Sequence, residues 1–315
     1  MKDSFGRDIH YLRISVTDLC NLRCIYCMPE AGVEKLRHDD ILSVEEISEI
    51  VSAAAECGIS KVRVTGGEPL VRNGIVEICR VISRTPGICE LCLTTNGILL
   101  PKFASDLKEA GVKRLNISLD SLDPDTYRKI TRTGTLDSAL AGVRTALETG
   151  FEAVKINAVL IGGVNNGEIL SLLELTRLYN VNVRFIEVMP IGECADWAES
   201  SFLSASHVLE LAPELRDVGI DGVAKLYKLP GGLGTVGLIS PISSHFCPTC
   251  NRIRVAADGK LKPCLHSADE VDLRGLHGTE LVDAIRAAIV AKPRKHRLDM
   301  GEISSSRRNM NAIGG

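Results

Sequence analysis

Residues 11–27, YLRISVTDLCNLRCIYC, join a strand-like run to three closely spaced cysteines. In the run YLRISV, apolar and polar side chains alternate with the period of a β-strand. Cys20, Cys24 and Cys27 follow the run directly. Because α/β folds place their functional groups in the loops after the strands, this stretch predicts a strand whose carboxyl end carries a three-cysteine site.

Strand-like and helix-like runs alternate from residue 11 to about residue 190. Strands are expected at 11–16, 61–66, 90–96, 114–120, 152–161 and 181–189, and helices at 43–58, 74–84, 102–111, 136–150 and 166–180. Ser43 and Glu46 form a capping-box pattern, and Gly58, Gly111 and Gly150 are helix stop signals. The repetition predicts βαβ units and a parallel sheet, either a partial barrel or an open doubly wound sheet.

Polar side chains recur with period two on most of these strands, although a strand covered on both faces is normally apolar. The sets are Arg13 and Ser15; Lys61, Arg63 and Thr65; Thr94 and Asn96; Asn116, Ser118 and Asp120; and Lys155 and Asn157. Each set lies on one face of its strand. The pattern favours a shared polar cavity inside an incomplete barrel over scattered exposed faces. An anion site is the interpretation we favour for the basic residues, and an ion-pair network with Asp120 and Glu187 is the alternative.

Composition limits the class of protein. The chain has 315 residues, enough for one large domain or two smaller ones, and a net charge of −3, which gives no bulk attraction to nucleic acid or to an anionic membrane. The N-terminus lacks the apolar core of a secretory signal, and apolar runs end well before 18 residues, so we expect a cytoplasmic protein.

Eleven cysteines in such a chain argue against a disulfide framework. Two groups of three stand out by their spacing. The other five are expected to be small buried hydrophobic residues: Cys57, Cys79, Cys89, Cys92 and Cys194.

The first group, Cys20, Cys24 and Cys27, supplies three thiols and has no histidine close in sequence. A structural zinc site closes with four ligands, whereas a [4Fe–4S] cluster held by three cysteines keeps one iron open for another molecule. The spacing and its place after a strand therefore favour iron–sulfur over zinc.

The second group lies beyond residue 200, where the strand–helix rhythm gives way to short strands and glycine-rich turns, and we divide the chain into domains at 1–215 and 216–315. Cys247, Cys250 and Cys264 are also consistent with a zinc site completed by His245 or His266. Arg252 and Arg254 lie two apart on a likely strand beside them, which favours phosphate or carboxylate binding.

Two motifs carry a resemblance. CNLRCIYC (20–27) and TGGEP (65–69) resemble the radical S-adenosylmethionine (SAM) superfamily, in which three cysteines hold a [4Fe–4S] cluster and SAM chelates the fourth iron. Together with LTTNG, NISLDSL, RFIEVMPIG, CPTCNRIRVAADGKLKPCL and the terminal Gly-Gly, they are similar to the GTP 3′,8-cyclase family of molybdenum cofactor biosynthesis, from about residue 5 to residue 315. The resemblance implies an incomplete (β/α)6 TIM-type barrel and a smaller C-terminal module that carries a second [4Fe–4S] cluster.

The resemblance also implies an activity. Such an enzyme converts GTP to (8S)-3′,8-cyclo-7,8-dihydroguanosine 5′-triphosphate after a 5′-deoxyadenosyl radical abstracts the C3′ hydrogen. An external electron donor would supply reducing equivalents, a cyclic pyranopterin monophosphate synthase would use the product, and a homodimer is allowed. Nucleic acid and membrane partners are not expected.

Site residues follow from the resemblance, position by position. The clusters would be held by Cys20, Cys24 and Cys27 and by Cys247, Cys250 and Cys264. SAM would contact Tyr26, Gly66, Gly67, Glu68, Ser118 and Met189. GTP would contact Arg13, Lys61, Arg63, Thr94, Lys155, Arg184, Arg252 and Arg254. Catalysis would depend on Arg252, Arg254, Gly314 and Gly315.

One departure and two alternatives accompany this assignment. Leu19 stands where the family commonly has arginine, which affects a peripheral contact and no ligand. The first alternative is another radical SAM enzyme with an auxiliary cluster, for example one that modifies a peptide. The second is a non-catalytic metal-binding regulator of nucleic acid, which would need a basic surface.

Overall fold

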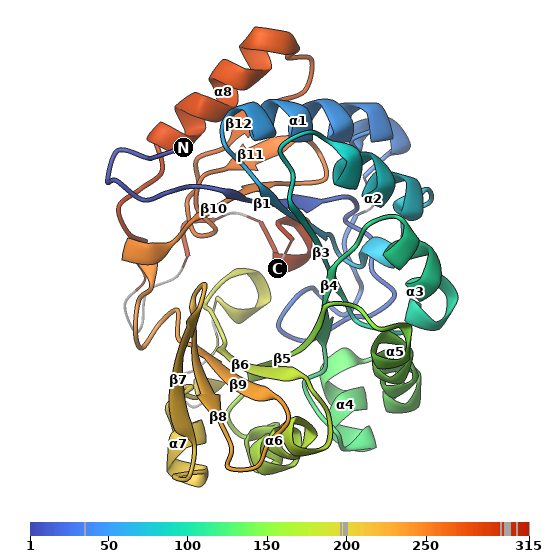
Figure 1. Ribbon diagram of the computed structural model, residues 1–315, viewed down its shortest axis with the longest axis vertical. Helices are drawn as coiled ribbons and strands as arrows, with labels where there is room; N and C mark the ends of the chain where they lie inside the picture. The colour runs from blue at the N-terminus through green and yellow to red at the C-terminus, as the bar shows by residue number, and fades with distance from the viewer. Residues whose placement is uncertain are drawn as a thin grey trace.

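A curved sheet organises the fold (Figure 1), with the strand order β12-β11-β10-β1-β2-β3-β4-β5-β6-β9-β8-β7. The computed structural model describes residues 1–34, 36–195, 197, 201–296, 298, 304–306 and 308–314. From β10 to β9 every neighbouring pair is parallel, and the strands beyond these two are antiparallel.

The strands and helices have the following bounds. The strands are β1 Tyr11–Ser15, β2 Lys61–Thr65, β3 Glu90–Thr95, β4 Arg114–Ser118, β5 Ala153–Leu160, β6 Asn182–Glu187, β7 Arg216–Asp221, β8 Ala224–Lys228, β9 Thr235–Ile239, β10 Arg252–Val255, β11 Lys260–Lys262 and β12 Val271–Asp272. The helices are α1 Val44–Glu56, α2 Ile75–Arg84, α3 Leu100–Glu109, α4 Pro124–Thr131, α5 Leu136–Thr149, α6 Ile169–Leu178, α7 His207–Leu211 and α8 Gly278–Val290.

The expected βαβ repeat is confirmed: β1 to β6 lie at the six expected positions, and α1, α2, α3, α5 and α6 at the five helical ones. The capping box of Ser43 and Glu46 is formed at the start of α1. Gly58, Gly111 and Gly150 all have positive φ, as helix stop signals require. Helices α4 and α7 were not predicted from the sequence, and they are short, at 8 and 5 residues.

The incomplete barrel is confirmed, and the open doubly wound sheet is wrong, because α1 to α6 lie around the outside of the curve (Figure 1). Outward-facing strand residues such as Leu12, Ile14 and Val64 are fully buried beneath these helices. Burial of this apolar face stabilises the barrel at about 25 cal/mol for each Å² removed from water. The inward face is left to the polar sets.

The C-terminal part of the chain extends the same sheet at both edges. Strand β9 pairs with β6 in parallel, and β10 pairs in parallel with β1 at the opposite edge. The division into domains at 215/216 stays a prediction. These pairings place the second cysteine group next to the first strand of the barrel.

Burial differs among the five isolated cysteines. Cys57, Cys79, Cys92 and Cys194 are buried as expected, but the prediction is wrong for Cys89, which is exposed in the turn before β3. Its neighbours Gly87 and Ile88 belong to the loop between α2 and β3, where the chain runs over the surface. Among the described residues, no helix is both long enough and apolar enough to cross a membrane.

Candidate active site

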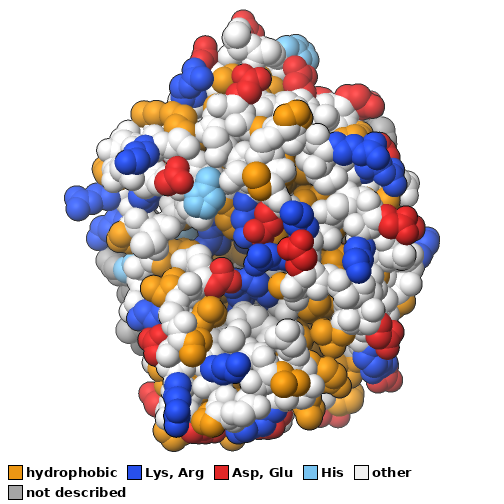
Figure 2. All heavy atoms as spheres, viewed as in Figure 1, with side chains coloured by type: hydrophobic (Ala, Val, Ile, Leu, Met, Phe, Trp, Pro, Cys, Tyr) orange, Lys and Arg blue, Asp and Glu red, His pale blue; other side chains and the backbone are white. Residues whose placement is uncertain are grey.

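A cavity of about 440 Å³ opens on the inner side of the curved sheet. It is lined by Arg13, Cys20, Cys24, Tyr26, Cys27, Lys61, Arg63, Gly66, Gly67, Glu68, Thr94, Ser118, Lys155, Arg184, Met189, Arg252 and Arg254. Figure 2 shows the basic side chains in a central hollow, with acidic ones close by. The period-two polar sets therefore face one cavity, as expected, except for Ser15, which is fully buried and is not among the lining residues.

The first cysteine group forms a folded turn after β1. The amide of Leu22 donates to Cys20 Sγ at 3.3 Å, and the amides of Cys27 and Met28 donate to the carbonyl oxygen of Cys24. Burial raises the pKa of the Cys20 thiol to about 11 and of the Cys27 thiol to about 12. Because a metal displaces these protons on binding, three thiols at a cavity wall form a suitable donor set for an iron–sulfur cluster.

The loop of Gly66 and Gly67 packs against the backbone that leads into the first cysteine. A Cβ on Gly67 would meet the carbonyl oxygen of Leu19 at 2.4 Å, and one on Gly66 would meet that of Thr17 at 2.7 Å. The amide of Gly67 donates to the same Thr17 oxygen at 2.8 Å. Glycine is therefore needed here for close backbone contact, and that contact fixes the loop beside the cysteine turn.

Glu68 lines the cavity, but its carboxylate is already used by the chain. Oε1 accepts from Thr95 Oγ1 at 2.7 Å and from the Leu70 amide at 3.1 Å, and Oε2 accepts from the Asn96 amide at 2.7 Å. Burial raises the pKa of Glu68 to about 7, although these hydrogen bonds oppose the shift. The structure gives Glu68 a positioning role, since it ties the loop after β2 to the end of β3.

Tyr26 is also held by a carboxylate. Its hydroxyl donates to Asp120 Oδ2 at 2.7 Å, while Asp120 Oδ1 accepts from the Val159 amide at 2.8 Å. Burial raises the pKa of Asp120 to about 6. Met189 lies beyond the end of β6 and lines the cavity, although it is an odd number of positions from Arg184 and would face the other side of a continued strand.

Three arginines form a row across adjacent strands. Arg13 on β1 is in register with Arg254 on β10 and with Arg63 on β2. Burial, followed by the charges of its neighbours, holds the pKa of Arg13 well below its usual value, and the pKa of Arg254 falls to about 10 for the same reasons. A buried row of like charges is stabilised by an anion, so this wall of the cavity has the electrostatics of an anion site.

Arg252 adds a donor to that wall. Its Nη2 atom is buried and has no hydrogen-bond partner among the described residues, and its guanidinium lies 5.5 Å from the ring centre of Phe246. A buried donor without a partner costs roughly 1–3 kcal/mol of folding free energy, so the arrangement favours a ligand that accepts from it.

Asp221 supplies an internal anion on the opposite side of the basic set. It ends β7 at the tip of the β7–β8 hairpin, and its Oδ2 accepts from Lys155 Nζ and, at 2.5 Å, from Arg184 Nη2. Burial would raise the pKa of this carboxyl, but these two cations lower it to about 2. Glu90 pairs with Lys61 at 2.7 Å in the same way.

The two carboxylates of the alternative ion-pair network have other partners. Glu187 is completely buried and accepts from the amides of Ala205, Ile242 and Ser243, and Asp120 holds Tyr26. Among the described ion pairs, neither carboxylate meets the basic set. Asp221 and Glu90 neutralise part of that set instead.

The second cysteine group lies behind the cavity wall. Cys247, Cys250 and Cys264 do not line the cavity, but their chain neighbours Phe246, Asn251 and Leu265 do. Among the described residues, no three His, Cys, Asp or Glu side chains lie close enough to share one metal ion. In a [4Fe–4S] cluster each thiolate binds a different iron, so the three sulfur atoms lie further apart than the ligands of a single metal ion.

The two histidines of the zinc alternative have other partners. His266 Nδ1 lies 3.1 Å from Ser304 Oγ, and His245 Nδ1 lies 3.0 Å from the carbonyl oxygen of Pro241. A zinc-bound histidine uses one ring nitrogen for the metal and the other for a supporting hydrogen bond, and in both of these histidines Nδ1 makes a contact of the second kind.

The C-terminal residues reach the cavity wall. Arg254 Nη1 donates to the carbonyl oxygen of Gly314 at 2.6 Å, and Asn311 Nδ2 donates to that of Asp18 at 3.3 Å. Gly314 has a φ of +66°, and a Cβ there would lie 2.1 Å from Thr65 Oγ1. Gly314 therefore packs against the strands that carry the arginine row, and its catalytic role stays a prediction; Gly315 lies outside the described residues.

Two contributors to the site were missed from the sequence. Tyr11 accepts a hydrogen bond from Arg63 Nε, and Asp221 pairs with two cations. The Asp221-Gly222 dipeptide is a hairpin signal, so the turn itself was predictable. Which side chain the turn would aim into the barrel depends on the pairing of β9 with β6, which local patterns do not encode.

Comparisons with known proteins agree with this architecture. Residues 14–176 match the family model described as the Radical SAM superfamily, and residues 181–298 match that described as Molybdenum Cofactor Synthesis C. The fold is similar to that of Streptococcus suis SuiB bound to S-adenosylmethionine, with a TM-score of 0.63 and 15% identity over 89% of this chain and 68% of that one. Together with the three-cysteine turn at the cavity, these matches define the class, which is the radical SAM enzymes.

Two curated relatives narrow the class. "GTP 3′,8-cyclase" of Alkaliphilus oremlandii (strain OhILAs) is 51% identical over 320 residues, and that of Alkaliphilus metalliredigens (strain QYMF) is 52% identical over 320 residues. Each alignment covers 100% of this chain and 100% of the relative. The chain belongs to the GTP 3′,8-cyclase family.

Proposed function

We propose that this protein is a GTP 3′,8-cyclase, which converts GTP to (8S)-3′,8-cyclo-7,8-dihydroguanosine 5′-triphosphate in the first step of molybdenum cofactor biosynthesis. One observation carries the proposal: the turn with Cys20, Cys24 and Cys27 and the basic wall with Arg13, Arg63 and Arg252 face the same cavity. A cofactor held at the cysteine turn and a nucleotide held at the basic wall would therefore meet in this cavity.

The cofactors are two [4Fe–4S] clusters and SAM. Cys20, Cys24 and Cys27 would hold the cluster that binds SAM, and the loop of Gly66 and Gly67 would lie beside it. Once bound, these cofactors supply one-electron chemistry that generates a carbon radical able to take a hydrogen atom from the ribose. The chain's own part is to hold the nucleotide close by and to keep water out.

The basic set would hold the triphosphate. Lys155 and Arg184 lie on adjacent parallel strands, with Lys61 and Arg63 further around the barrel. Guanidinium groups pair with phosphate oxygens through two parallel hydrogen bonds, and lysines add point charges. Thr94 Oγ1 lies 3.4 Å from Arg63 Nη1 and would help to orient that side chain.

The second cluster would be held by Cys247, Cys250 and Cys264, behind Arg252 and Arg254. Asn251 and Leu265, which line the cavity, directly follow Cys250 and Cys264 in the sequence. A guanine base in the cavity would therefore lie close to the second cluster. Arg252 Nη2, which is buried and has no hydrogen-bond partner among the described residues, would donate to such a ligand.

Three further parts of the proposal concern partners. Reduction of the cluster requires an external electron donor. The product would pass to a cyclic pyranopterin monophosphate synthase. A homodimer stays a prediction.

Anaerobic turnover tests the function. Enzyme reconstituted with iron and sulfide is given SAM, dithionite and GTP, and the products are separated by chromatography. We expect 5′-deoxyadenosine together with a cyclised nucleotide that is absent when GTP is omitted. If SAM is cleaved equally well without GTP and no GTP is consumed, the substrate is wrong, and a peptide-modifying radical SAM enzyme becomes the better hypothesis.

A further inference from the structure

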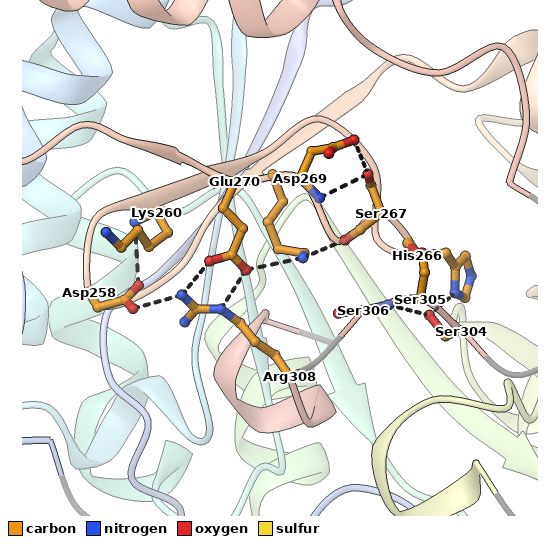
Figure 3. A network of polar contacts seen from close by, with 11 residues as sticks. Asp258, Lys260, His266, Ser267, Asp269, Glu270, Ser304, Ser305, Ser306 and Arg308 are labelled. Atoms are coloured by element: carbon orange, nitrogen blue, oxygen red, sulfur yellow. Dashed lines mark hydrogen bonds and ion pairs between the residues drawn. The ribbon is translucent and has the colours of Figure 1, made fainter.

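Arg308 fastens the C-terminal tail, defined as residues 304–306 and 308–314, near its start. Arg308 Nε donates to Glu270 Oε1 at 2.6 Å and its Nη2 donates to Glu270 Oε2 at 2.7 Å, so the pair is bidentate (Figure 3). Nη2 also donates to Asp258 Oδ2 at 2.8 Å. The side chains of all three residues are only 21–23% exposed. Such a charge-assisted fork holds both distance and orientation.

A buried lysine fixes Glu270 from its other side. Lys262 Nζ donates to Glu270 Oε1 at 3.1 Å and to the carbonyl oxygen of Ser267 at 2.7 Å, and its side chain is 1% exposed. Because a buried ammonium needs a counterion, Glu270 is held in place whether or not the tail is docked. Glu270 is thus a rigid receptor for Arg308.

The receptor is held by the hairpin that carries the active-site arginines, because Glu270 follows β11 and pairs with Lys262 at the end of that strand. The β10–β11 hairpin, Arg252–Lys262, has Asp258 in its turn and Lys262 at its end. Arg254 on the same hairpin is in register with Lys262 and holds the carbonyl oxygen of Gly314. The hairpin therefore holds the tail at two points, near its start through Arg308 and at its last described residue through Arg254.

Two cluster cysteines bracket this hairpin. Cys250 lies two residues before β10 begins and Cys264 lies two residues after β11 ends. Beyond Cys264, the carbonyl oxygen of His266 accepts from Ser305 Oγ at 2.5 Å (Figure 3). The chain therefore contacts the tail both before Cys264, at Asp258, and after it, at His266.

We propose that Arg308 is the positioning residue that docks the tail onto the β10–β11 hairpin, and that docking is coupled to occupancy of the Cys247, Cys250 and Cys264 site. The inference rests on the proposed function, because it assigns that site a cluster. Arg308 touches neither substrate nor cluster. It sets where Gly314 lies by fixing the tail to the element whose two ends carry Cys250 and Cys264.

Carboxypeptidase digestion tests this without turnover. The full chain, anaerobically reconstituted, is digested, and mass spectrometry follows loss of residues up to and including Ile313. In Arg308→Ala we expect about tenfold faster loss than in the unmodified protein, since a bidentate charged pair is removed. Asp258→Asn, which removes only one contact, should give a smaller increase. The matched control is Arg286→Ala, an exposed arginine of α8 paired with Asp283.

The coupling has its own readout. Loss should be faster from cluster-free protein than from reconstituted protein, and this difference should shrink in Arg308→Ala. A thermal melt and the iron content of the variant distinguish undocking from global unfolding. Equal release from Arg308→Ala and unmodified protein would overturn the docking role. Equal release with and without iron would overturn the coupling. Neither measurement uses GTP, so failure here is distinct from failure of the proposed reaction.

Discussion

Arg254 donates a 2.6 Å hydrogen bond to the carbonyl oxygen of Gly314. This contact places the last described residue beside the row of three arginines that crosses β10, β1 and β2. The position is tight, since a Cβ on Gly314 would meet Thr65 and Ser15. The tail therefore forms part of the cavity wall, and its conformation bears directly on where a nucleotide can lie.

Gly314→Ala tests this close fit. The added methyl would lie 2.1 Å from Thr65 Oγ1 at a φ of +66°, so the tail must shift outward and release Arg254. We expect kcat for GTP cyclisation to fall by about 100-fold, the scale on which a misplacement of about 1 Å acts. The circular dichroism spectrum should not change, because Gly314 lies outside the helices and strands.

Gly163→Ala is the matched control. Gly163 also has positive φ, +73°, but nothing lies within 4 Å of a Cβ there. Its cost is limited to backbone strain of roughly 1 kcal/mol, which stability measurements would detect and kinetics would not. If both substitutions slow turnover equally, then strain and not tail placement is responsible, and the role of Gly314 is lost.

Asp221→Asn should strengthen GTP binding. Asp221 pairs with Lys155 and Arg184, two of the cations assigned to the triphosphate, and its negative charge opposes a polyanion. We expect about tenfold tighter binding at low salt and a smaller gain at 0.5 M salt, where exposed charges are screened. Calorimetry with GTP and anaerobic protein measures both.

The pKa of Asp221 also predicts how the tighter GTP binding of Asp221→Asn changes with pH. The pKa of Asp221 is about 2, so the carboxylate stays ionised at neutral pH, and the gain should be the same at pH 7.5 and pH 8.5, where the terminal phosphate of GTP is ionised as well. Asp283→Asn, on exposed α8, removes a charge of the same sign without facing the cavity and should leave affinity unchanged. Weaker binding by Asp221→Asn would mean that the carboxylate orients the two cations for the ligand.

Local patterns were sufficient for the barrel and most of its lining. Period two along a strand places alternate residues on opposite faces, so Arg63, Thr94 and Lys155 were predicted to share a face, and they line the same cavity. The pleat is a property of each strand by itself. No tertiary information is needed once the strands are known to be parallel.

The contacts that close the site depend on long-range pairing. Asp221 reaches the cations only because β9 pairs with β6 and carries the β7–β8 hairpin with it. Arg308 meets Glu270 across 38 positions of sequence. Neither residue has a local pattern that distinguishes it from a solvated surface charge, so the sequence alone did not identify them.

Cysteine substitutions should separate the two clusters. Cys24→Ser removes a thiol that lines the cavity, and Cys250→Ser removes one behind the wall, so each should lower iron from about eight to about four per chain. The exposed Cys89 gives the control, and Cys89→Ser should keep all the iron. Iron and sulfide analysis after anaerobic reconstitution measures this. A chain that keeps full iron in Cys250→Ser would remove the second group from the cluster assignment.

Arg7 is expected to stabilise the second cysteine group from the N-terminus. Its Nε donates to Asp3 at 2.6 Å, and its guanidinium donates to the carbonyl oxygens of Cys247, Pro293 and Arg294 at 2.7–3.0 Å. Lysine cannot reproduce this planar fork, so Arg7→Lys should lower the free energy of unfolding by about 2–3 kcal/mol, measured by chemical denaturation at pH 7.

The same contact predicts how that loss changes with pH. Burial opposes ionisation of Asp3, but Arg7 outweighs it and lowers the pKa of this carboxyl below its value in the unfolded chain. A lowered carboxyl pKa stabilises the fold above the unfolded value, about 3.9, and the contribution disappears as pH falls through the folded value. The difference in the free energy of unfolding between Arg7→Lys and the unmodified protein should therefore be constant from pH 6 to pH 8 and become smaller below pH 4.

The exposed pair of Arg286 and Asp283 supplies the control, since Arg286→Lys should change the free energy of unfolding by less than about 0.5 kcal/mol at every pH. A difference that grows on acidification would mean that Asp3 is not the partner that makes Arg7 stabilising.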